Sequence, residues 1–200
     1  MMTLYNIPMS GNCHKVRLLL SLLKLDYTTH DLDLSKNEQK SEAYLQRNPF
    51  GQAPVLDDNG TIIRDSQAIL VYLSSQYGGD QWWPQNPKQL AEVTAWLSTA
   101  ANEIANGPAL LRAHHLFGRE INQTMALATT EKVLNIINTH LINKTWLVDD
   151  TMSIADIAIY PYIALAHQGK VDISFFTQIS AWCKRIESLP NYIAMPGINV

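Results

Sequence analysis

The sequence predicts an α+β protein in which a small domain containing a sheet precedes an all-helical domain. In the first third of the chain, short apolar runs alternate with amphipathic segments, a pattern typical of alternating strands and helices. The stretch 77–87 is dense in Gly and Pro, which favours a linker. Beyond it, apolar residues recur only at helical spacing. We therefore expect a first domain over residues 1–78, a linker over 79–87 and a helical domain over 88–200.

The first domain begins with a strand, a helix and a second strand. Residues 4–7 are a short extended run that ends at Pro8. Between residues 16 and 23, Val and Leu recur at i, i+3, i+4 and i+7, which marks an amphipathic helix. Residues 27–34 return to an extended pattern. Short connections between these three elements predict a right-handed βαβ unit with parallel strands.

The rest of this domain reads as a short helix, a hairpin and a longer helix. The short helix is expected over 41–46, and the strands over 54–56 and 61–63 flank Asn-Gly at 59–60, a strong hairpin signal. Asp-Ser at 65–66 then opens a helix. The resulting order, βαβ, helix, ββα, is a thioredoxin-like arrangement.

The second domain reads as a helical bundle with helices over 88–116, 122–142, 153–165 and 174–188. Ser153 followed by Asp156 resembles a capping box that starts the third helix. Pro108 is expected to end or kink the first helix, or to follow a break at Gly107. In the last helix, one stripe holds Phe175, Ile179, Trp182, Ile186 and Leu189.

The composition describes a compact soluble globule whose partner is a small molecule or another protein. Of 200 residues, 46% are apolar and 16% are charged, and the net charge of -3 excludes a nucleic-acid binder or a polybasic membrane anchor. The two cysteines, Cys13 and Cys183, have no zinc-ligand spacing, which fits a reducing cytosol. Because His114 and His115 diverge by about 100° on a helix, we expect no shared metal. The absence of a signal peptide and of a run of about 18 apolar residues predicts a cytoplasmic protein.

Three segments carry candidate chemistry. At the first strand-to-helix turn, Ser10, Asn12 and Cys13 surround a helix N-terminus, where the local field favours an anion. In the segment 48–56, Asn-Pro-Phe-Gly-Gln-Ala-Pro-Val-Leu, a cis proline would leave the preceding backbone free to pair with an extended peptide. The segment 64–69 supplies a second helix N-terminus with a hydroxyl and a carboxylate. Together they predict a site for a small, zwitterionic, sulfur-bearing peptide.

These motifs make the sequence resemble the cytosolic glutathione transferases over nearly the whole chain. The most specific segments are 48–56, Asp-Ser-Gln-Ala-Ile at 65–69, and Ser-Ile-Ala-Asp-Ile at 153–157. The resemblance implies a thioredoxin-like domain followed by an all-α domain, a cytoplasmic homodimer and a role in detoxification. It implies glutathione as co-substrate and no metal.

The resemblance also implies which residues bind glutathione. Asp65 and Ser66 match the pair that holds the γ-glutamyl end, and the backbone of Ala53, before Pro54, matches the position that pairs with the cysteinyl part. Gln39 stands where several classes have histidine. We therefore assign the glycine carboxylate to Lys40 and Gln52.

The turn at residues 8–16 matches two patterns of the family. Ser10, Cys13 and Val16 match classes in which a serine hydroxyl donates to the glutathione thiolate, whereas Ser10, Asn12 and Lys15 resemble a bacterial group with Thr-Pro-Asn at the turn. Some members of that group reduce disulfides. The predicted activity is conjugation of glutathione to electrophilic, mostly apolar substrates. Disulfide reduction and a non-catalytic glutathione-binding module are the alternatives.

The second substrate is expected between the two domains. Met9 and the residues Asn102, Asn106 and Leu110, which recur at four-residue spacing, are the predicted lining of that pocket. A helix surface at a dimer interface explains the same spacing equally well. Phe50 is a large apolar residue in a polar turn, and we expect it to enter a pocket between helices of a second subunit.

Overall fold

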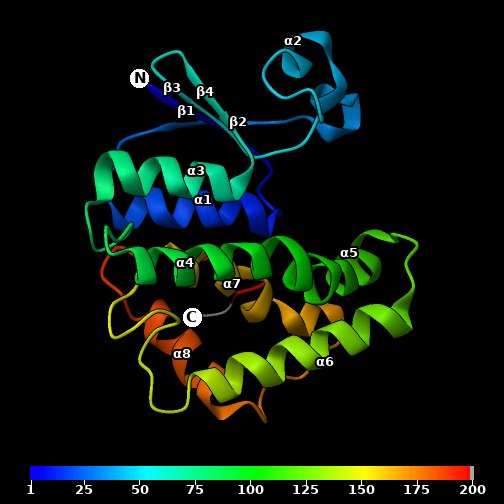
Figure 1. Cartoon of the computed structure of the whole chain (residues 1–200). Coiled ribbons are helices and arrows are strands. Elements are labelled where there is room, and N and C mark those ends of the chain that lie inside the picture. The colour runs from blue at the N-terminus through cyan, green and yellow to red at the C-terminus, as the bar shows by residue number, and fades with distance from the viewer. Residues whose placement is uncertain (199–200) are drawn as a thin grey trace.

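The structure, a computed structural model, describes residues 1–198 and has the predicted α+β fold. Figure 1 shows the sheet of the N-terminal domain on one side and the helical domain on the other. Helices α1 (Gly11–Leu22) and α3 (Ser66–Leu73) pack side by side between them. Both helices belong to the sheet-containing domain, and both pack against the helical domain.

The sheet has four strands in the order β2-β1-β3-β4. β1 and β2 are parallel, and the other two pairs are antiparallel. The predicted hairpin is confirmed: Asn59 and Gly60 both have positive φ angles, 51° and 92°, as the mirror-image hairpin turns require. The strands are β1 (Met2–Asn6), β2 (Thr28–Asp31), β3 (Val55–Asp58) and β4 (Thr61–Arg64).

Short helical segments connect these strands. The connection from β2 to β3 is η1 (Leu34–Lys36), η2 (Glu38–Lys40) and α2 (Glu42–Leu45). The extended pattern expected over 27–34 is thus a shorter strand followed by a 3₁₀ turn, because the Asp33 carboxylate caps that turn by accepting from the Ser35 and Lys36 amides. After α3, the π-helical turn η3 (Ser74–Gly78) ends the first domain's helices.

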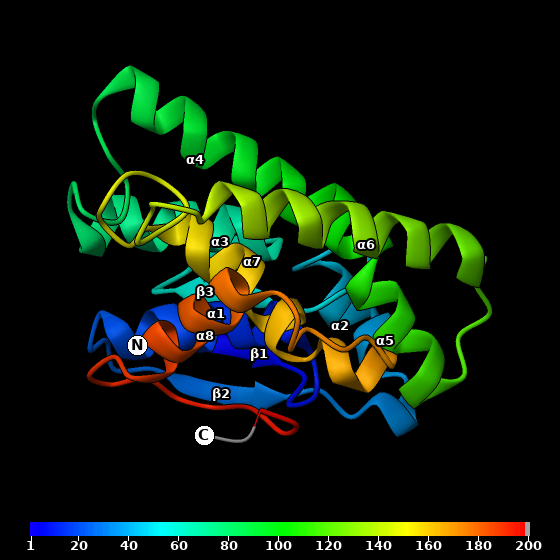
Figure 2. The same ribbon diagram turned by 90° about the horizontal axis from the view of Figure 1, so that it is seen from below.

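Helices make up the rest of the described chain, which contains no strand beyond residue 64. Figure 2 shows α6 running alongside α4, with α7 between them and the first domain. No helix of residues 1–198 has the length and hydropathy of a membrane span. The elements are α4 (Pro87–Thr99), η4 (Ala100–Ile104), α5 (Pro108–Phe117), α6 (Gln123–His140), α7 (Ile154–Ala164), η5 (Ala166–Gly169) and α8 (Thr177–Glu187).

The single helix expected over 88–116 is interrupted. A π-helical turn, η4, follows α4, and the chain breaks at Gly107 before Pro108 starts α5. Proline has no amide hydrogen to donate to the preceding turn, so a helix starts at it more easily than it continues through it. Beyond the break, α5 shares a cavity with residues 7–10, the loop that precedes α1.

Helix α7 is the centre of the helical domain, and the predicted capping box at its start is confirmed. Asp156 is fully buried and accepts hydrogen bonds from the Leu147 and Ser153 amides, both at 3.0 Å. It also accepts one from Trp182 Nε1 at 2.9 Å. One carboxyl group therefore joins the loop before α7, the start of α7 and helix α8.

One residue of the predicted apolar stripe in the last helix is misplaced. Ile179, Trp182 and Ile186 are buried as expected, but Phe175 is 85% exposed. Helix α8 begins at Thr177, so helical spacing does not orient a residue that precedes it. The expectation for Phe175 was wrong for that reason.

Candidate functional site

The N-terminus of α1 presents Ser10 and Asn12 at the junction of the two domains. Ser10 is the N-cap, and its Oγ accepts a hydrogen bond from the Cys13 amide at 3.3 Å. Because this bond uses an oxygen lone pair, the hydroxyl hydrogen is available to another acceptor. The helix N-terminus adds its own positive field. The arrangement suits an anion beside Ser10.

Cys13 faces the interior instead. Its side chain is fully buried, and its Sγ accepts a hydrogen bond from the Ile7 amide at 3.3 Å. Burial raises the pKa of the thiol above its ordinary value, against the smaller opposing effects of Ser10 and Ile7. These surroundings favour a neutral thiol that packs β1 against α1.

The loop before β3 holds an extended backbone segment beside this turn. The Ala53–Pro54 peptide bond is cis, as the motif indicated. The Gln52 carbonyl is fixed by two donors, Asn48 Nδ2 at 2.7 Å and the Tyr44 hydroxyl at 2.9 Å. Within residues 1–198 the Ala53 amide and carbonyl have no hydrogen-bond partner. They are positioned to pair with the backbone of a bound peptide.

The N-terminus of α3 is the third segment that borders this site, beside the N-terminus of α1 and the loop before β3. Asp65 has a positive φ of 74° and caps the helix through Oδ1, which accepts from the Gln67 and Ala68 amides at 2.9 and 3.1 Å. Both capping bonds end on the same oxygen, so Oδ2 remains for an external cation. The neighbouring Ser66 is buried, and its hydroxyl donates to the Gln67 side-chain oxygen.

These three segments meet at one cavity of about 150 Å³. It brings Asn12 together with five of the six residues predicted to bind glutathione. The sixth, Lys40, lies outside the lining, and its Nζ donates to the Phe50 carbonyl at 3.2 Å, beside the loop that forms one wall. The lining comprises Asn12, Asn48, Phe50, Gln52, Ala53, Pro54, Arg64, Asp65 and Ser66.

Two larger cavities lie where the helical domain meets this site. One, of about 430 Å³, extends from Asn12, Gln52 and Asp65 to Asn106 and Leu110. The other, of about 550 Å³, is more apolar and is lined by residues of the first turn, of the loop after β2, of α5 and of α7. They are Ile7, Pro8, Met9, Ser10, Leu32, Asp33, Leu34, Ala109, Arg112, Ala113, Phe117 and Tyr162.

The predicted second-substrate residues divide between these cavities. Met9 lines the apolar cavity, and Asn106 and Leu110 line the other. Asn102 is exposed on the π-helical turn η4 and lines neither. A π turn holds more residues than an α turn, so the four-residue spacing does not keep Asn102 on the face of Asn106.

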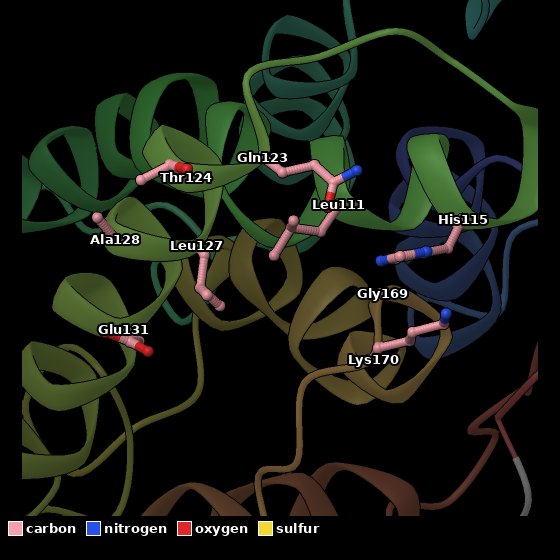
Figure 3. Close-up of a pocket in the computed structure, with 9 residues that line it drawn as sticks. All are labelled: Leu111, His115, Gln123, Thr124, Leu127, Ala128, Glu131, Gly169 and Lys170. Atoms are coloured by element: carbon pink, nitrogen blue, oxygen red, sulfur yellow. The ribbon is translucent and has the colours of Figure 1, made fainter.

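A further cavity, of about 660 Å³, is separate from the interface and lies within the helical domain (Figure 3). It is bounded by α5, α6 and the turn after η5, with His115 and Lys170 on one side and Glu131 on the other. It shares no lining residue with the cavities described above.

Within residues 1–198, no cluster of three or more His, Cys, Asp or Glu side chains could hold a metal ion.

Comparison with known proteins establishes the family. The model of the glutathione S-transferase N-terminal domain matches residues 1–75, and that of the C-terminal domain matches residues 97–190. The crystal structure of glutathione S-transferase from Pseudomonas fluorescens is 31% identical, with a TM-score of 0.91, and 98% of each chain is covered. The chain belongs to the glutathione S-transferase family. The predicted family and its two-domain fold are therefore confirmed.

Relatives within the glutathione S-transferase family differ in the activity their names describe. The chain is 29% identical to the disulfide-bond oxidoreductase YfcG of Escherichia coli over 95% of this chain and 92% of the relative. It is 28% identical to glutathione S-transferase PARB of Nicotiana tabacum, with 93% and 92% covered. A glutathione transferase homolog from Drosophila mojavensis, solved with bound glutathione, is 30% identical with a TM-score of 0.85, over 94% and 88% of the chains.

Sequence reasoning missed Tyr162, which joins α7 to the N-terminus of α1. Its ring lies so close to Gly11 that a Cβ there would be 2.7 Å from Cζ. Burial raises the pKa of Tyr162, so its phenol stays neutral. The buried Lys15 ammonium lies 5.4 Å from the centre of the ring, and burial lowers the pKa of Lys15 to about 7, while Asp65 opposes that shift. No periodicity in the apolar helix α7 indicates that Tyr162 reaches the other domain.

Arg112 was also missed. It lines the apolar cavity from α5, although its side chain is only 4% exposed. The sequence does contain a signal: Arg112 is the one charged residue between Pro108 and Ala113. Arg and Lys side chains are almost never fully buried unless they are paired, so a buried cation in an apolar run calls for a partner or a ligand.

Proposed function

We propose that the protein is a homodimeric glutathione transferase that binds glutathione at the 150 Å³ cavity and its rim and activates it as a thiolate for attack on an electrophilic carbon. One observation carries the proposal. The N-termini of α1 and α3 and the free backbone of Ala53 meet at a single cavity. Such a cavity offers two sites for anionic groups and one for an extended peptide.

Each part of glutathione has a matching group in this arrangement. Its γ-glutamyl carboxylate fits the N-terminus of α3 at Ser66, whose hydroxyl would turn from the Gln67 side chain to donate to it, and its ammonium fits the free Oδ2 of Asp65. Its cysteinyl backbone pairs with Ala53. We assign the glycine carboxylate to Gln52 in the wall and to Lys40 beside it.

The sulfur is then expected at the N-terminus of α1. Ser10 has a hydroxyl hydrogen to donate, and Asn12 lines both the glutathione cavity and the adjoining interdomain cavity. A hydrogen bond to a charged acceptor such as the thiolate stabilises the charged form by about 1.5 to 3 kcal/mol. Together with the helix field, this is enough to ionise a thiol near neutral pH. The buried Cys13 is left a structural role in this mechanism.

Glutathione-dependent disulfide reduction is the second candidate. It is supported by the likeness to the oxidoreductase YfcG and by the place of Asn12 in the glutathione cavity. Both activities use the same thiolate, so the structure of the site alone favours neither. They differ in whether the sulfur attacks carbon or another sulfur.

Calorimetry with glutathione, a conjugation assay with an electrophilic chloroarene and a disulfide-reduction assay test the proposal together. Binding with conjugation supports it. Binding with disulfide reduction only supports the second candidate, and binding without either supports a non-catalytic glutathione-binding module. Absence of glutathione binding contradicts all three.

A dimer is proposed from two complementary features of the surface. Phe50 is 58% exposed, with the Arg64 guanidinium 4.8 Å from its ring centre. A cavity of about 450 Å³ between α4 and α6 has apolar side chains in its lining, Trp96, Val133 and Ile136 among them, beside the charged residues Glu92, Glu103, Lys132 and Lys144. In a two-fold symmetric dimer each subunit can present both the ring and the cavity. We assign the cavity to Phe50 of the second copy.

Sedimentation tests both parts of the assignment, the Phe50 anchor and the cavity that receives it. Phe50→Ala and Ile136→Arg are each expected to shift the protein towards monomer, because the first removes the anchor and the second fills its cavity with charge. Phe175→Ala is the matched control, since Phe175 is exposed on a different part of the molecule. A wild-type protein that is monomeric at micromolar concentration refutes the dimer.

A further inference from the structure

Arg112 is a buried cation without a buried counter-ion. Its Nε donates to Gln168 Oε1 at 2.6 Å, and its guanidinium lies 5.7 Å from the centre of the Phe117 ring. Its Nη2 is buried and has no hydrogen-bond partner among residues 1–198. Among residues 1–198, no carboxylate oxygen lies within 4.0 Å of the Arg112 guanidinium nitrogens. Arg112 therefore lines the apolar cavity and carries a guanidinium nitrogen that no hydrogen bond satisfies.

The acidic group in that cavity is already engaged. Asp33 lines the cavity near the loop after β2. Its Oδ1 accepts from the Ser35 hydroxyl at 2.5 Å, and its Oδ2 pairs with Lys36 Nζ at 2.9 Å. These partners hold the pKa of Asp33 at about 2. Asp33 is thus a charged but satisfied group, and it does not neutralise Arg112.

An unpaired guanidinium in this position is costly. Removing a charge from water costs several kcal/mol unless hydrogen bonds and an opposite charge compensate. The neighbours of Arg112 in the cavity supply an aromatic face and a neutral phenol, from Phe117 and Tyr162, and neither carries a negative charge. A ligand with an anionic group would supply the missing compensation.

We infer that the second substrate carries a carboxylate that binds Arg112 while its apolar body lies against Met9, Leu34 and Phe117. This inference rests on the proposed function, because it places the electrophile in the cavity that Ser10 lines. A single cation, with Asp33 also on the lining, favours one negative charge over two. The ligand class is therefore an electrophilic organic monoacid with an apolar or aromatic frame.

The reaction that tests this class is aromatic substitution. In 4-chloro-3-nitrobenzoate, the glutathione thiolate forms a bond to the ring carbon that carries chlorine, and chloride leaves with the electrons of the broken bond. The thiol proton has already passed to solvent. The carboxylate lies across the ring from the reacting carbon, so it can occupy Arg112 while that carbon faces the thiolate. The amide 4-chloro-3-nitrobenzamide has the same shape without the charge.

For each compound, kcat/KM is measured at saturating glutathione. It is then divided by the rate constant of the uncatalysed reaction of that compound with glutathione. We expect the wild type to favour the benzoate over the benzamide by about tenfold, the scale of one charge-assisted hydrogen bond. Arg112→Gln is expected to abolish the preference, and Arg112→Lys to retain part of it. Lys184→Gln removes an exposed positive charge on α8 and serves as the control. An equal rate for both compounds in the wild type, or an undiminished preference in Arg112→Gln, overturns the inference.

Binding separates this inference from the proposed function. Glutathione affinity, measured by calorimetry on every variant, reports on the fold and on the glutathione cavity. The two conjugates, S-(4-carboxy-2-nitrophenyl)glutathione and its carboxamide, then report on Arg112 without turnover. If glutathione binds and the conjugates bind equally, only the inference fails. If glutathione does not bind, the proposed function fails first.

Discussion

The contact between Gly11 and Tyr162 gives a sharp test of how the two domains meet. A Cβ at Gly11 would lie 2.7, 2.8 and 3.1 Å from three atoms of the Tyr162 ring. Real Cβ contacts are not that short, so the ring or the N-terminus of α1 must move. Overpacking of this kind costs about 1 to 3 kcal/mol, and the better helix propensity of alanine offsets at most about 1 kcal/mol. Gly11→Ala is therefore expected to destabilise the protein by about 1 to 2 kcal/mol.

A double-mutant cycle measured by urea denaturation identifies the cause. If the ring is the obstacle, Gly11→Ala is neutral or slightly stabilising in a Tyr162→Ala background, and the coupling energy is about 1 to 2 kcal/mol. Strictly additive effects of the two changes would refute the contact. A stabilising Gly11→Ala in the otherwise wild-type protein would refute the packing argument as a whole.

Three further predictions concern charged and polar groups. Ser66→Ala should weaken glutathione binding by about 1 to 2 kcal/mol in calorimetry, and unchanged affinity contradicts the carboxylate placement. Asp156→Ala leaves three buried donors without an acceptor, so urea denaturation should show a loss of at least about 3 kcal/mol; a loss under about 1 kcal/mol refutes the role of this carboxyl. Lys15 has a folded pKa of about 7 against 10.5, so the unfolded state binds more protons between these values and stability rises with pH across that window. The stabilisation by Lys15→Met, measured by urea denaturation, should therefore be larger at pH 7 than at pH 10, and a pH-independent difference between the two proteins contradicts it.

Local signals were sufficient to predict most of the fold. The Asn-Gly hairpin, the capping box at Ser153 and the helix break at Gly107 before Pro108 each depend on the conformation of a few adjacent residues. Such features need no tertiary information. The exposed position of Phe175 follows from the start of α8 at Thr177, and neither that start nor the π-helical turn η4 is marked by a local pattern in the sequence.

The candidate site likewise combines residues that local motifs predict with residues that depend on packing between distant helices. The segments around Ala53 and Ser66 carry compact motifs, and the structure brings them to one cavity with Asn12. Tyr162 and Arg112 reach the site from helices far along the chain. Their contribution depends on how α5 and α7 pack against the first domain. No spacing points to Tyr162, and the lone charge at Arg112 marks a special residue without locating it at the site.

The central claim is that the N-terminus of α1 ionises the sulfur of bound glutathione. An ultraviolet absorbance titration of the thiolate in the glutathione complex measures this directly, for the wild type, Ser10→Ala, Asn12→Ala and Cys13→Ser. We expect Ser10→Ala to raise the pKa of the bound thiol by about one to two units, equivalent to about 1.4 to 2.7 kcal/mol, and Cys13→Ser to leave it unchanged. Conjugation by Ser10→Ala should fall near neutral pH and recover as the pH rises. A shift confined to Asn12→Ala would transfer the role to that residue, and a Ser10→Ala protein with the wild-type pKa and the wild-type rate would contradict the assignment of Ser10.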